Sequence, residues 1–250
     1  MAHPPSNPGP EPSRMTIPTP AVIMITGASS GIGAATARLL AGPDRTLHLQ
    51  GRDESRLAAL ADAVRDAGGT PVVHRLDLAD HDAVDAEADR LAATLPRLDG
   101  LVHSAGVVSL GPVESAAIED LDRQYAINLR APFALTTALT PALVAAGGQV
   151  VFVNSGAGQR ASPGWSQYAS SKFGLRAVAD AYRAEVADRG VRVTTIYPGR
   201  TATPMQAEVH RQEGRAYDPD AFATPEDVAG SIEHALEMPR SATVPEISVR

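Results

Sequence analysis

The chain has 250 residues, of which 44% are hydrophobic and 20% are charged, so it can bury one large core and is too short for several. Its 22 Lys and Arg residues against 29 Asp and Glu residues give a net charge of -7, which argues against a nucleic-acid partner. The chain has no cysteine, which excludes disulfides, thiolate metal sites and a cysteine nucleophile, and which fits a cytoplasmic location.

The first 20 residues contain seven prolines and lack the charged and apolar regions of a signal peptide. We therefore expect a disordered leader at residues 1–20 and a single domain at residues 21–250. The best candidate for a membrane span is residues 131–159, which carry no charge. Threonines, Pro141 and a Gly147-Gly148 pair interrupt this stretch, so we expect a buried helix, then a strand, and no membrane partner.

Short β-branched segments alternate along the chain with longer segments in which apolar residues recur three or four positions apart. Because parallel strands need crossover connections, this alternation predicts an α/β fold with a parallel sheet covered by helices on both faces. Strands are expected at Ala21–Thr26, Thr46–Gln50, Pro71–Leu76, Gly100–His103, Gln149–Asn154, Val191–Tyr197 and Val244–Val249. Helices are expected at Gly33–Ala41, Glu54–Ala67, Ala83–Leu95, Ile118–Ala146, Gln167–Arg189 and Pro225–Glu237.

One long break in this alternation runs from Gly199 to Ala223 and contains Pro204, Gly214 and Pro219. A segment of this length is uncommon as a simple connection, so we interpret residues 199–223 as a lid or binding segment. An ordinary surface loop is the alternative.

A glycine turn follows the first expected strand, in the segment Thr26-Gly27-Ala28-Ser29-Ser30-Gly31-Ile32-Gly33. Gly27 would allow a sharp exit from the strand, Gly31 a close approach of a ligand, and Gly33 close packing of the helix on the sheet. Because amide groups at a helix N-terminus can hold a phosphate, the turn indicates dinucleotide binding. A tight turn without a ligand remains the alternative.

The end of the second expected strand bears on which dinucleotide would bind. Gly51 stands where an NAD-binding protein normally has a carboxylate for the ribose hydroxyls. The next residue, Arg52, can pair its guanidinium with a 2′-phosphate, which favours NADP(H) over NAD(H). Asp53 could serve as the missing acid, but its position before Glu54 is typical of a helix N-cap.

Tyr168 and Lys172 are four residues apart at the start of an expected helix, so their side chains should lie on one face. A nearby ammonium and a positive nicotinamide would lower the pKa of the phenol and make it useful as an acid and base. An exposed pair without a role is the alternative. Ser155 should emerge at the carboxyl edge of the sheet, where its hydroxyl could bind a carbonyl oxygen, or serve as a turn residue.

Asn128 lies within the expected helix Ile118–Ala146, four residues before Pro132. Proline has no N–H, so the carbonyl of Asn128 should lack its helical partner. A kink there would let this carbonyl hold a water near Lys172, which would extend a proton path from Tyr168 to solvent.

These residues resemble the classical short-chain dehydrogenase/reductase family over nearly all of the chain from about residue 20. The motifs occur in the order Thr26-Gly27-x-x-x-Gly31-x-Gly33, Asp77-Leu78, Ala105-Gly106, Asn128, Ser155, Tyr168-x-x-x-Lys172 and Pro198-Gly199 followed by Thr203. The resemblance implies a Rossmann-like three-layer α/β/α sandwich with a seven-stranded parallel sheet. It also implies a catalytic tetrad: Tyr168 as acid and base, Ser155 on the carbonyl, Lys172 on the nicotinamide ribose, and Asn128 on a relay water.

The resemblance further implies which residues contact the cofactor: Gly27, Ser29, Ser30, Gly31, Ile32, Gly33, Arg52, Asp77, Leu78, Ser104, Ala105, Gly106, Tyr168, Lys172, Pro198, Gly199, Thr201 and Thr203. His103 and Ser104 replace two asparagines that brace the central strands in the family, and we interpret His103 as structural. Ser30 stands where some NADP-binding relatives have a basic residue, so Arg52 must supply most of the phosphate recognition.

The resulting hypothesis is an NADP(H)-dependent oxidoreductase that interconverts a secondary alcohol and a ketone or aldehyde carbonyl without a metal. The substrate pocket is expected to include Ala157, Gln159, Ser162, Trp165, Met205 and Tyr217. The alternatives are a non-catalytic NADP-binding sensor and the same chemistry with NAD(H). By resemblance, the helices at 118–146 and 167–189 would form the interface of a homodimer or homotetramer.

Overall fold

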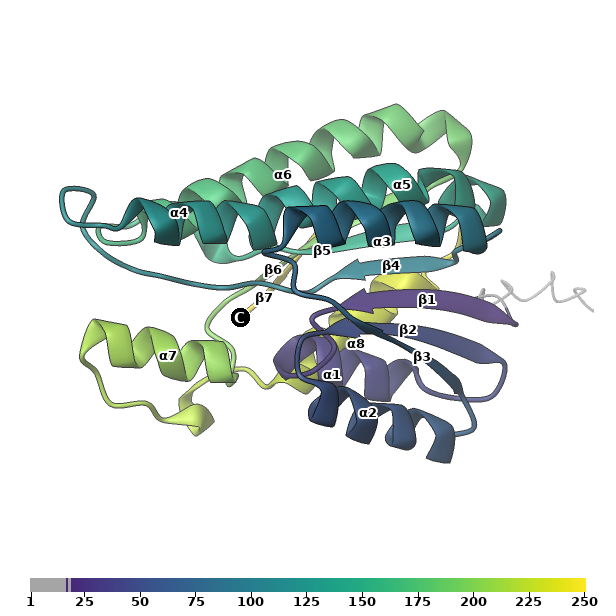
Figure 1. The fold of residues 1–250 in the computed structure, drawn as a ribbon, viewed down its shortest axis with the longest axis horizontal. Coiled ribbons are helices and arrows are strands. Elements are labelled where there is room, and N and C mark those ends of the chain that lie inside the picture. The colour runs from purple at the N-terminus through teal and green to yellow at the C-terminus, as the bar shows by residue number, and fades with distance from the viewer. Residues whose placement is uncertain (1–16, 18) are drawn as a thin grey trace, which may run out of the picture.

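A single sheet of parallel strands forms the centre of the molecule in a computed structural model, which describes residues 17 and 19–250 (Figure 1). The strand order is β3-β2-β1-β4-β5-β6-β7, so the expected seven-stranded parallel sheet is confirmed. The order reverses between β1 and β4, which is where ligands bind in open sheets of this kind. The strands are β1 Ala21–Thr26, β2 Arg45–Gly51, β3 Thr70–Arg75, β4 Gly100–His103, β5 Gln149–Val153, β6 Arg192–Pro198 and β7 Glu246–Val249.

Helices cover both faces of the sheet (Figure 1). One layer holds α3 His81–Thr94, α4 Ile118–Tyr125, α5 Ala131–Ala146 and α6 Ser166–Val186, and the other holds α1 Gly31–Leu40, α2 Glu54–Asp66 and α8 Pro225–Glu237. The remaining helix, α7 Pro204–Glu213, lies apart from both layers. This arrangement is the expected three-layer sandwich.

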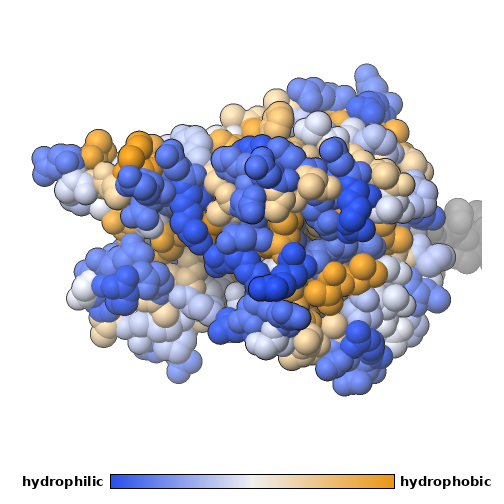
Figure 2. All heavy atoms as spheres, in the orientation of Figure 1, coloured by the Kyte–Doolittle hydropathy of each residue, from blue (hydrophilic) through white to orange (hydrophobic). Residues whose placement is uncertain are grey.

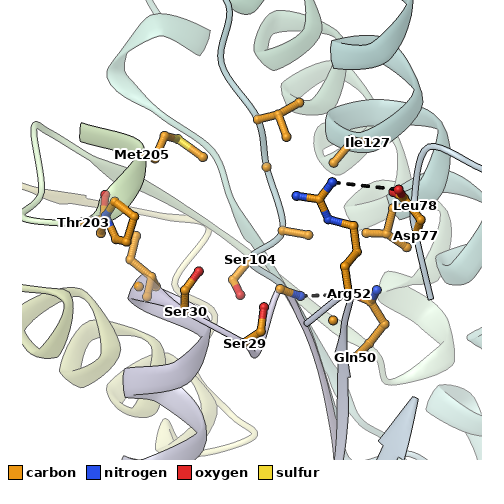
Figure 3. Close-up of a pocket in the computed structure, with 18 residues that line it drawn as sticks. Ser29, Ser30, Gln50, Arg52, Asp77, Leu78, Ser104, Ile127, Thr203 and Met205 are labelled. Carbon is orange, nitrogen blue, oxygen red and sulfur yellow. Dashed lines mark hydrogen bonds and ion pairs between the residues drawn. The ribbon is translucent and has the colours of Figure 1, made fainter. Parts of the chain in front are cut away.

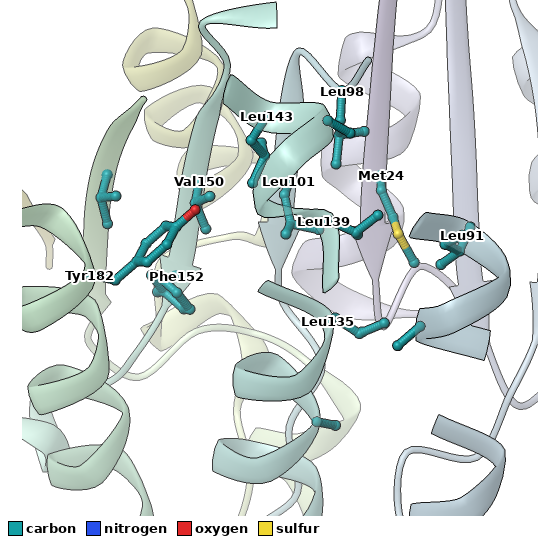
Figure 4. Close-up of a cluster of buried hydrophobic side chains, with 14 of the residues drawn as sticks. Met24, Leu91, Leu98, Leu101, Leu135, Leu139, Leu143, Val150, Phe152 and Tyr182 are labelled. Carbon is teal, nitrogen blue, oxygen red and sulfur yellow. The ribbon is translucent and has the colours of Figure 1, made fainter. Parts of the chain in front are cut away.

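Apolar residues of the central strands alternate between the two faces, because successive side chains of a strand point in opposite directions. In β1, Met24 packs under α3 and α5, whereas Ile23 and Ile25 pack under α1 and α8. Figure 4 shows Met24 beside Leu135 and Leu139 of α5 in the first of these cores. The buried sheet therefore offers only its edges to solvent and ligands.

The helical stretch Ile118–Ala146 differs from the single helix expected, because a wide π-helical turn at Ala126–Arg130 joins α4 to α5. The N–H of Ala131 donates to the carbonyl of Ala126, and Pro132, which has no N–H, follows at once. By length and composition this stretch could cross a membrane. Its residues Leu135, Leu139 and Leu143 are nevertheless buried against the sheet. Figure 2 shows both hydrophilic and apolar residues on the surface of the helical layer that contains this stretch.

The segment 199–223 also differs from expectation, because it contains α7 and is not an irregular break. The Thr203 hydroxyl accepts a hydrogen bond from the Gln206 N–H (3.2 Å), and Gly214 ends the helix in a left-handed conformation. The Thr-Pro start and the Gly stop are sequence signals for a helix that were overlooked.

The expected leader, residues 1–20, lies almost entirely outside the described residues. Ile17, which is described, is only 5% exposed and packs in the core beside β1 and α8. Ile17 therefore belongs to the packed core, and the disordered leader stays a prediction.

Candidate active site

Loops that follow β1, β4, β5 and β6 meet at the carboxyl edge of the sheet. Ser104 Oγ donates to the carbonyl of Thr26 (2.5 Å), and the N–H of Ala105 donates to Thr26 Oγ1 (3.3 Å). Ser104 thus joins β1 to β4, where the family has asparagine. His103 is buried, bonds Thr136 Oγ1 through Nε2 (2.9 Å) and has a pKa lowered by burial to about 3, as suits a structural histidine.

A crevice runs along this edge beside the glycine turn (Figure 3). Its lining includes the following residues expected to contact the cofactor: Gly27, Ser29, Ser30, Gly31, Ile32, Arg52, Asp77, Leu78, Ser104, Ala105, Gly106 and Thr203. Gly33 does not line it. A Cβ on Gly33 would lie 2.6 Å from Ser104 Oγ and would overlap the Gly27 carbonyl, so this glycine serves the packing of α1 as expected.

Gln50, at the end of β2, is a residue that sequence reasoning missed. Its Oε1 accepts from the N–H of Gly27 (3.1 Å) and its Nε2 donates to the carbonyl of Leu76 (2.7 Å), so it fixes the glycine turn to β2 and β3. The available signal was a glutamine at the end of the expected strand, directly before Gly51. Asp53 accepts from the N–H of Arg56 (3.0 Å), which confirms its interpretation as an N-cap.

Arg52 points into the crevice toward Asp77, with Nη1 of Arg52 3.8 Å from Oδ2 of Asp77 (Figure 3). Both side chains are about half exposed (53% and 46%), so this pair contributes at most about 1 kcal/mol and can be opened easily. Arg75 is the register partner of Gly51 across β2 and β3, and its Nη1 lies 3.7 Å from Glu54. The two weakly paired guanidinium groups of Arg52 and Arg75 line a small hollow beside Asp77, next to the crevice.

A second cavity of about 430 Å³ adjoins the crevice and shares five lining residues with it: Ile32, Ser104, Gly106, Thr203 and Met205. The second cavity is lined by Ser155, Tyr168 and Lys172, by Pro198, Gly199 and Thr201, which were expected to contact the cofactor, and by the expected pocket residues Ala157, Ser162, Trp165 and Met205.

Two expected pocket residues do not line this cavity. Gln159 is exposed, and Tyr217 packs on His210 and Phe222. Both assignments came from position in the sequence alone, and the fold places these side chains elsewhere.

Four further residues line the cavity without having been expected there: Arg160 in the loop before α6, Arg200 between β6 and α7, and Gln206 and Val209 of α7. The overlooked helix signals in 203–214 would have indicated that Gln206 and Val209 share a face. Gln212 connects α7 to the segment after β4, because its Oε1 accepts a hydrogen bond from the N–H of Leu110 (2.7 Å).

Tyr168 and Lys172 are both buried, one helical turn apart in α6. Lys172 Nζ donates to the carbonyl of Val153 (3.1 Å) and lies 5.9 Å from the centre of the Tyr168 ring. Burial raises the pKa of Tyr168 to about 12, opposed by a hydrogen bond with the Ser155 side chain. Burial also lowers the pKa of Lys172 to about 8.

In the protein without a bound cofactor, burial therefore acts against an acidic phenol. Tyr168 is thus a neutral phenol at ordinary pH in the protein alone, and the expected lowering of its pKa by the ammonium of Lys172 and a positive nicotinamide stays a prediction.

Asn128 is fully buried in the π-helical turn, and its side chain hydrogen-bonds two other segments of the chain. Its Oδ1 accepts from the N–H of Val107 (2.9 Å), and its Nδ2 donates to the Val107 carbonyl (3.0 Å) and to Ser171 Oγ (3.0 Å). Asn128 thereby joins the segment after β4 to α6 beside Lys172. The relay water on its backbone carbonyl stays a prediction.

Asn154 was expected only as the end of a strand, yet it positions two catalytic candidates. Its Nδ2 donates to the Lys172 carbonyl (3.0 Å), and its Oδ1 accepts from the N–H of Ser155 (2.8 Å). Within the described part of the chain, no group of His, Asp and Glu residues could hold a metal ion.

Comparisons with known proteins agree with the family resemblance that the sequence motifs indicate. The sequence profile of the family described as short chain dehydrogenase matches residues 21–214. D-threitol dehydrogenase of Mycolicibacterium smegmatis is 39% identical over 190 residues, which cover 74% of this chain and 71% of that protein. Glycine betaine reductase ATRR of Emericella nidulans is 32% identical over 234 residues, which cover 91% of this chain but only 18% of that longer protein.

Among solved structures, a metagenomic short-chain oxidoreductase in complex with NADP matches with a TM-score of 0.78 and 30% identity, covering 93% of this chain and 97% of that chain. The family profile thus covers most of the chain, and the strand order and the ordered motifs agree with it. The chain therefore belongs to the short chain dehydrogenase family of oxidoreductases.

Proposed function

We propose that the protein is an NADP(H)-dependent oxidoreductase that interconverts a secondary alcohol and a ketone. One observation carries the proposal: Ser155, Tyr168 and Lys172 line a single cavity that continues into the crevice beside the glycine turn. Hydride transfer requires a carbonyl carbon next to the nicotinamide and a proton donor next to the carbonyl oxygen, and the two adjoining spaces would provide both positions.

The crevice residues fit a dinucleotide. Ser30 precedes α1 and its side chain makes no cap hydrogen bond, so its hydroxyl and the first N–H groups of α1 remain available to a phosphate. Asp77 and Leu78 would flank the adenine, and residues 198–203 would contact the nicotinamide carboxamide. When bound, NADP(H) donates or accepts the hydride.

The proton chemistry belongs to the chain's own side chains. Ser155 would donate a hydrogen bond to the carbonyl oxygen and stabilise its developing negative charge. Tyr168, protonated at neutral pH because burial raises its pKa to about 12, would give its proton to that oxygen during reduction. Lys172 would bind the nicotinamide ribose, and its ammonium would stabilise the phenolate that remains.

Arg52 supports NADP(H) over NAD(H). No carboxylate stands at Gly51 to bind the ribose hydroxyls, and among the described residues the guanidinium groups of Arg52 and Arg75 make only long ion pairs of 3.8 and 3.7 Å. A 2′-phosphate could therefore replace those partners with shorter, charge-assisted hydrogen bonds. The related metagenomic oxidoreductase was solved with NADP.

The function is tested by following NADPH oxidation at about 340 nm over a panel of ketones and aldehydes. Tyr168→Phe should reduce turnover by about 10²–10⁴-fold, because the proton donor is lost. Unchanged turnover in this variant would contradict the assignment of Tyr168. NADPH binding without turnover of any carbonyl would favour the alternative, an NADP-binding sensor.

We also propose that the protein forms a homodimer or homotetramer. Tyr125 of α4, Phe133 of α5 and Phe173 of α6 are exposed by 38%, 56% and 41%, although all are large and apolar. Packing these helices against a second copy would remove that surface from water. Light scattering measures the mass directly. Closure of α7 as a lid and a cytoplasmic location stay predictions.

A further inference from the structure

The charged side chains that line the second cavity, which contains Ser155, differ in sign from the net charge of the chain. The chain as a whole carries more acidic than basic residues. Around this cavity, however, the charged lining residues are Arg160, Lys172 and Arg200, and no carboxylate of the described chain lines it. A space with cations alone favours a negatively charged occupant.

The three cations are not equivalent. Lys172 is buried and donates to the Val153 carbonyl, so it belongs to the catalytic group. Arg200 binds both carboxylate oxygens of Glu213, with Nη2 2.7 Å from Oε1 and Nη1 3.0 Å from Oε2, and its charge is therefore largely neutralised. Among residues 17 and 19–250, no ion pair or side-chain hydrogen bond involves Arg160.

The backbone holds Arg160 at the cavity. Its N–H donates to the carbonyl of Gly156 (3.1 Å) in the short turn that follows Ser155. At the other end of the same loop, the Gly164 carbonyl accepts from the N–H of Gly111 (2.8 Å). An available guanidinium thus lies five residues after the serine that would bind the carbonyl oxygen, in a loop fixed at both ends.

We propose that the substrate carries a carboxylate several bonds away from its reacting carbonyl, and that Arg160 binds this carboxylate. The inference rests on the proposed function. The planar guanidinium can form two parallel hydrogen bonds with a carboxylate. The apolar side chains of Val108, Met205 and Val209 line the same cavity and would contact the carbon chain between the two groups.

Binding can be tested without turnover, because Trp165 is the single tryptophan of the chain and lines this cavity. Hexanoate and hexanamide, which differ in charge and hardly in shape, are titrated while Trp165 fluorescence is followed, with and without NADP⁺. The wild-type protein should bind hexanoate at least about tenfold more tightly than hexanamide. Arg160→Gln should remove most of this preference, and Arg160→Lys should keep part of it.

Arg123→Gln is the matched control, since Arg123 is exposed on α4, lies outside the cavity and has no ion pair in the described chain. This variant should keep the full preference. Equal binding of the two probes by the wild-type protein would overturn the proposal. A preference that survives in Arg160→Gln would also overturn it, because the anion would then bind Lys172 or Arg200.

Turnover gives a second readout. Linear methyl ketones with a terminal carboxylate are compared with their methyl esters, and the ratio of kcat/KM for acid over ester should fall at least about tenfold in Arg160→Gln, through KM. An unchanged ratio would contradict the proposal. If the fluorescence titration shows the preference while no ketone is reduced with either nicotinamide cofactor, the proposed reaction fails and the carboxylate site stands.

Discussion

Lys172 is the only lysine among the 22 basic residues, and its side chain is almost completely buried. Burial lowers the pKa of Lys172 from 10.5 to about 8, because the charged amine loses solvent. At about 1.4 kcal/mol per pKa unit, holding the charge in the folded protein costs about 3 kcal/mol at neutral pH. The site therefore pays in stability for an ammonium placed beside Tyr168.

The sign of the pH dependence follows from the two pKa values. Below pH 8 the amine is protonated in both the folded and the unfolded chain, and the full cost is present. Between pH 8 and 10.5 the unfolded chain binds more protons, so the contribution of this residue to the free energy of unfolding rises with pH. Above 10.5 the amine is neutral in both states and the cost disappears.

Lys172→Met keeps a similar volume and removes the charge. The loss of the hydrogen bond to the Val153 carbonyl should cost about 1 kcal/mol, which leaves a net gain of about 2 kcal/mol in the free energy of unfolding at pH 7. The gain should shrink as the pH approaches 10.5, while turnover is lost. Urea denaturation without cofactor at several pH values measures it. Arg176→Met is the control, because Arg176 is partly exposed one turn further along α6.

The same pKa can be observed directly. With ¹⁵N-labelled lysine, the protein should give a single side-chain amine signal, whose titration midpoint should lie near pH 8. A midpoint near 10.5, or a methionine variant that is less stable than the wild type at pH 7, would refute the reasoning from burial.

Three further predictions concern the cofactor crevice and the strands beside it. Arg52→Asp should raise KM for NADPH by about 10–100-fold and lower KM for NADH, because it removes a phosphate partner and supplies a carboxylate for the ribose hydroxyls; a cofactor preference that stays with NADPH would contradict the role of Arg52. Gly33→Ala should lower the free energy of unfolding by about 1–3 kcal/mol and weaken NADPH binding, because the Cβ of the alanine would overlap Gly27 and Ser104. An unchanged melting temperature would show that α1 can shift to accommodate the methyl group. His48 hydrogen-bonds His74 (2.9 Å), and burial lowers the pKa of His48 from 6.5 to about 4. Lowering the pH from 6.5 to 4 should therefore decrease the free energy of unfolding of the wild type, and decrease that of His48→Leu less. Parallel pH profiles of the two proteins in thermal melts would disprove this.

The sequence alone determined the order of elements. The alternation of β-branched segments and helical periodicity predicted each strand of the sheet to within a few residues, because period 2 and period 3.6 are local properties of the chain. The short local signals of α7 were overlooked, although Thr203, Pro204 and Gly214 mark both its ends. The motifs also named Ser155, Tyr168 and Lys172, since these residues lie at recognisable positions along strands and helices.

Tertiary structure alone decided the burial of these residues and their contacts. Spacing placed Lys172 beside Tyr168 but did not reveal that both are buried, and burial raises the pKa of the phenol in the protein without cofactor. The joining roles of Gln50, Asn128 and Asn154 depend on residues far along the chain, such as Leu76 and Val107, that only folding brings near. Arg160 lines the cavity and Tyr217 does not, and both facts follow from how the loops and α7 pack. No local sequence pattern determines which side chains meet across a cavity.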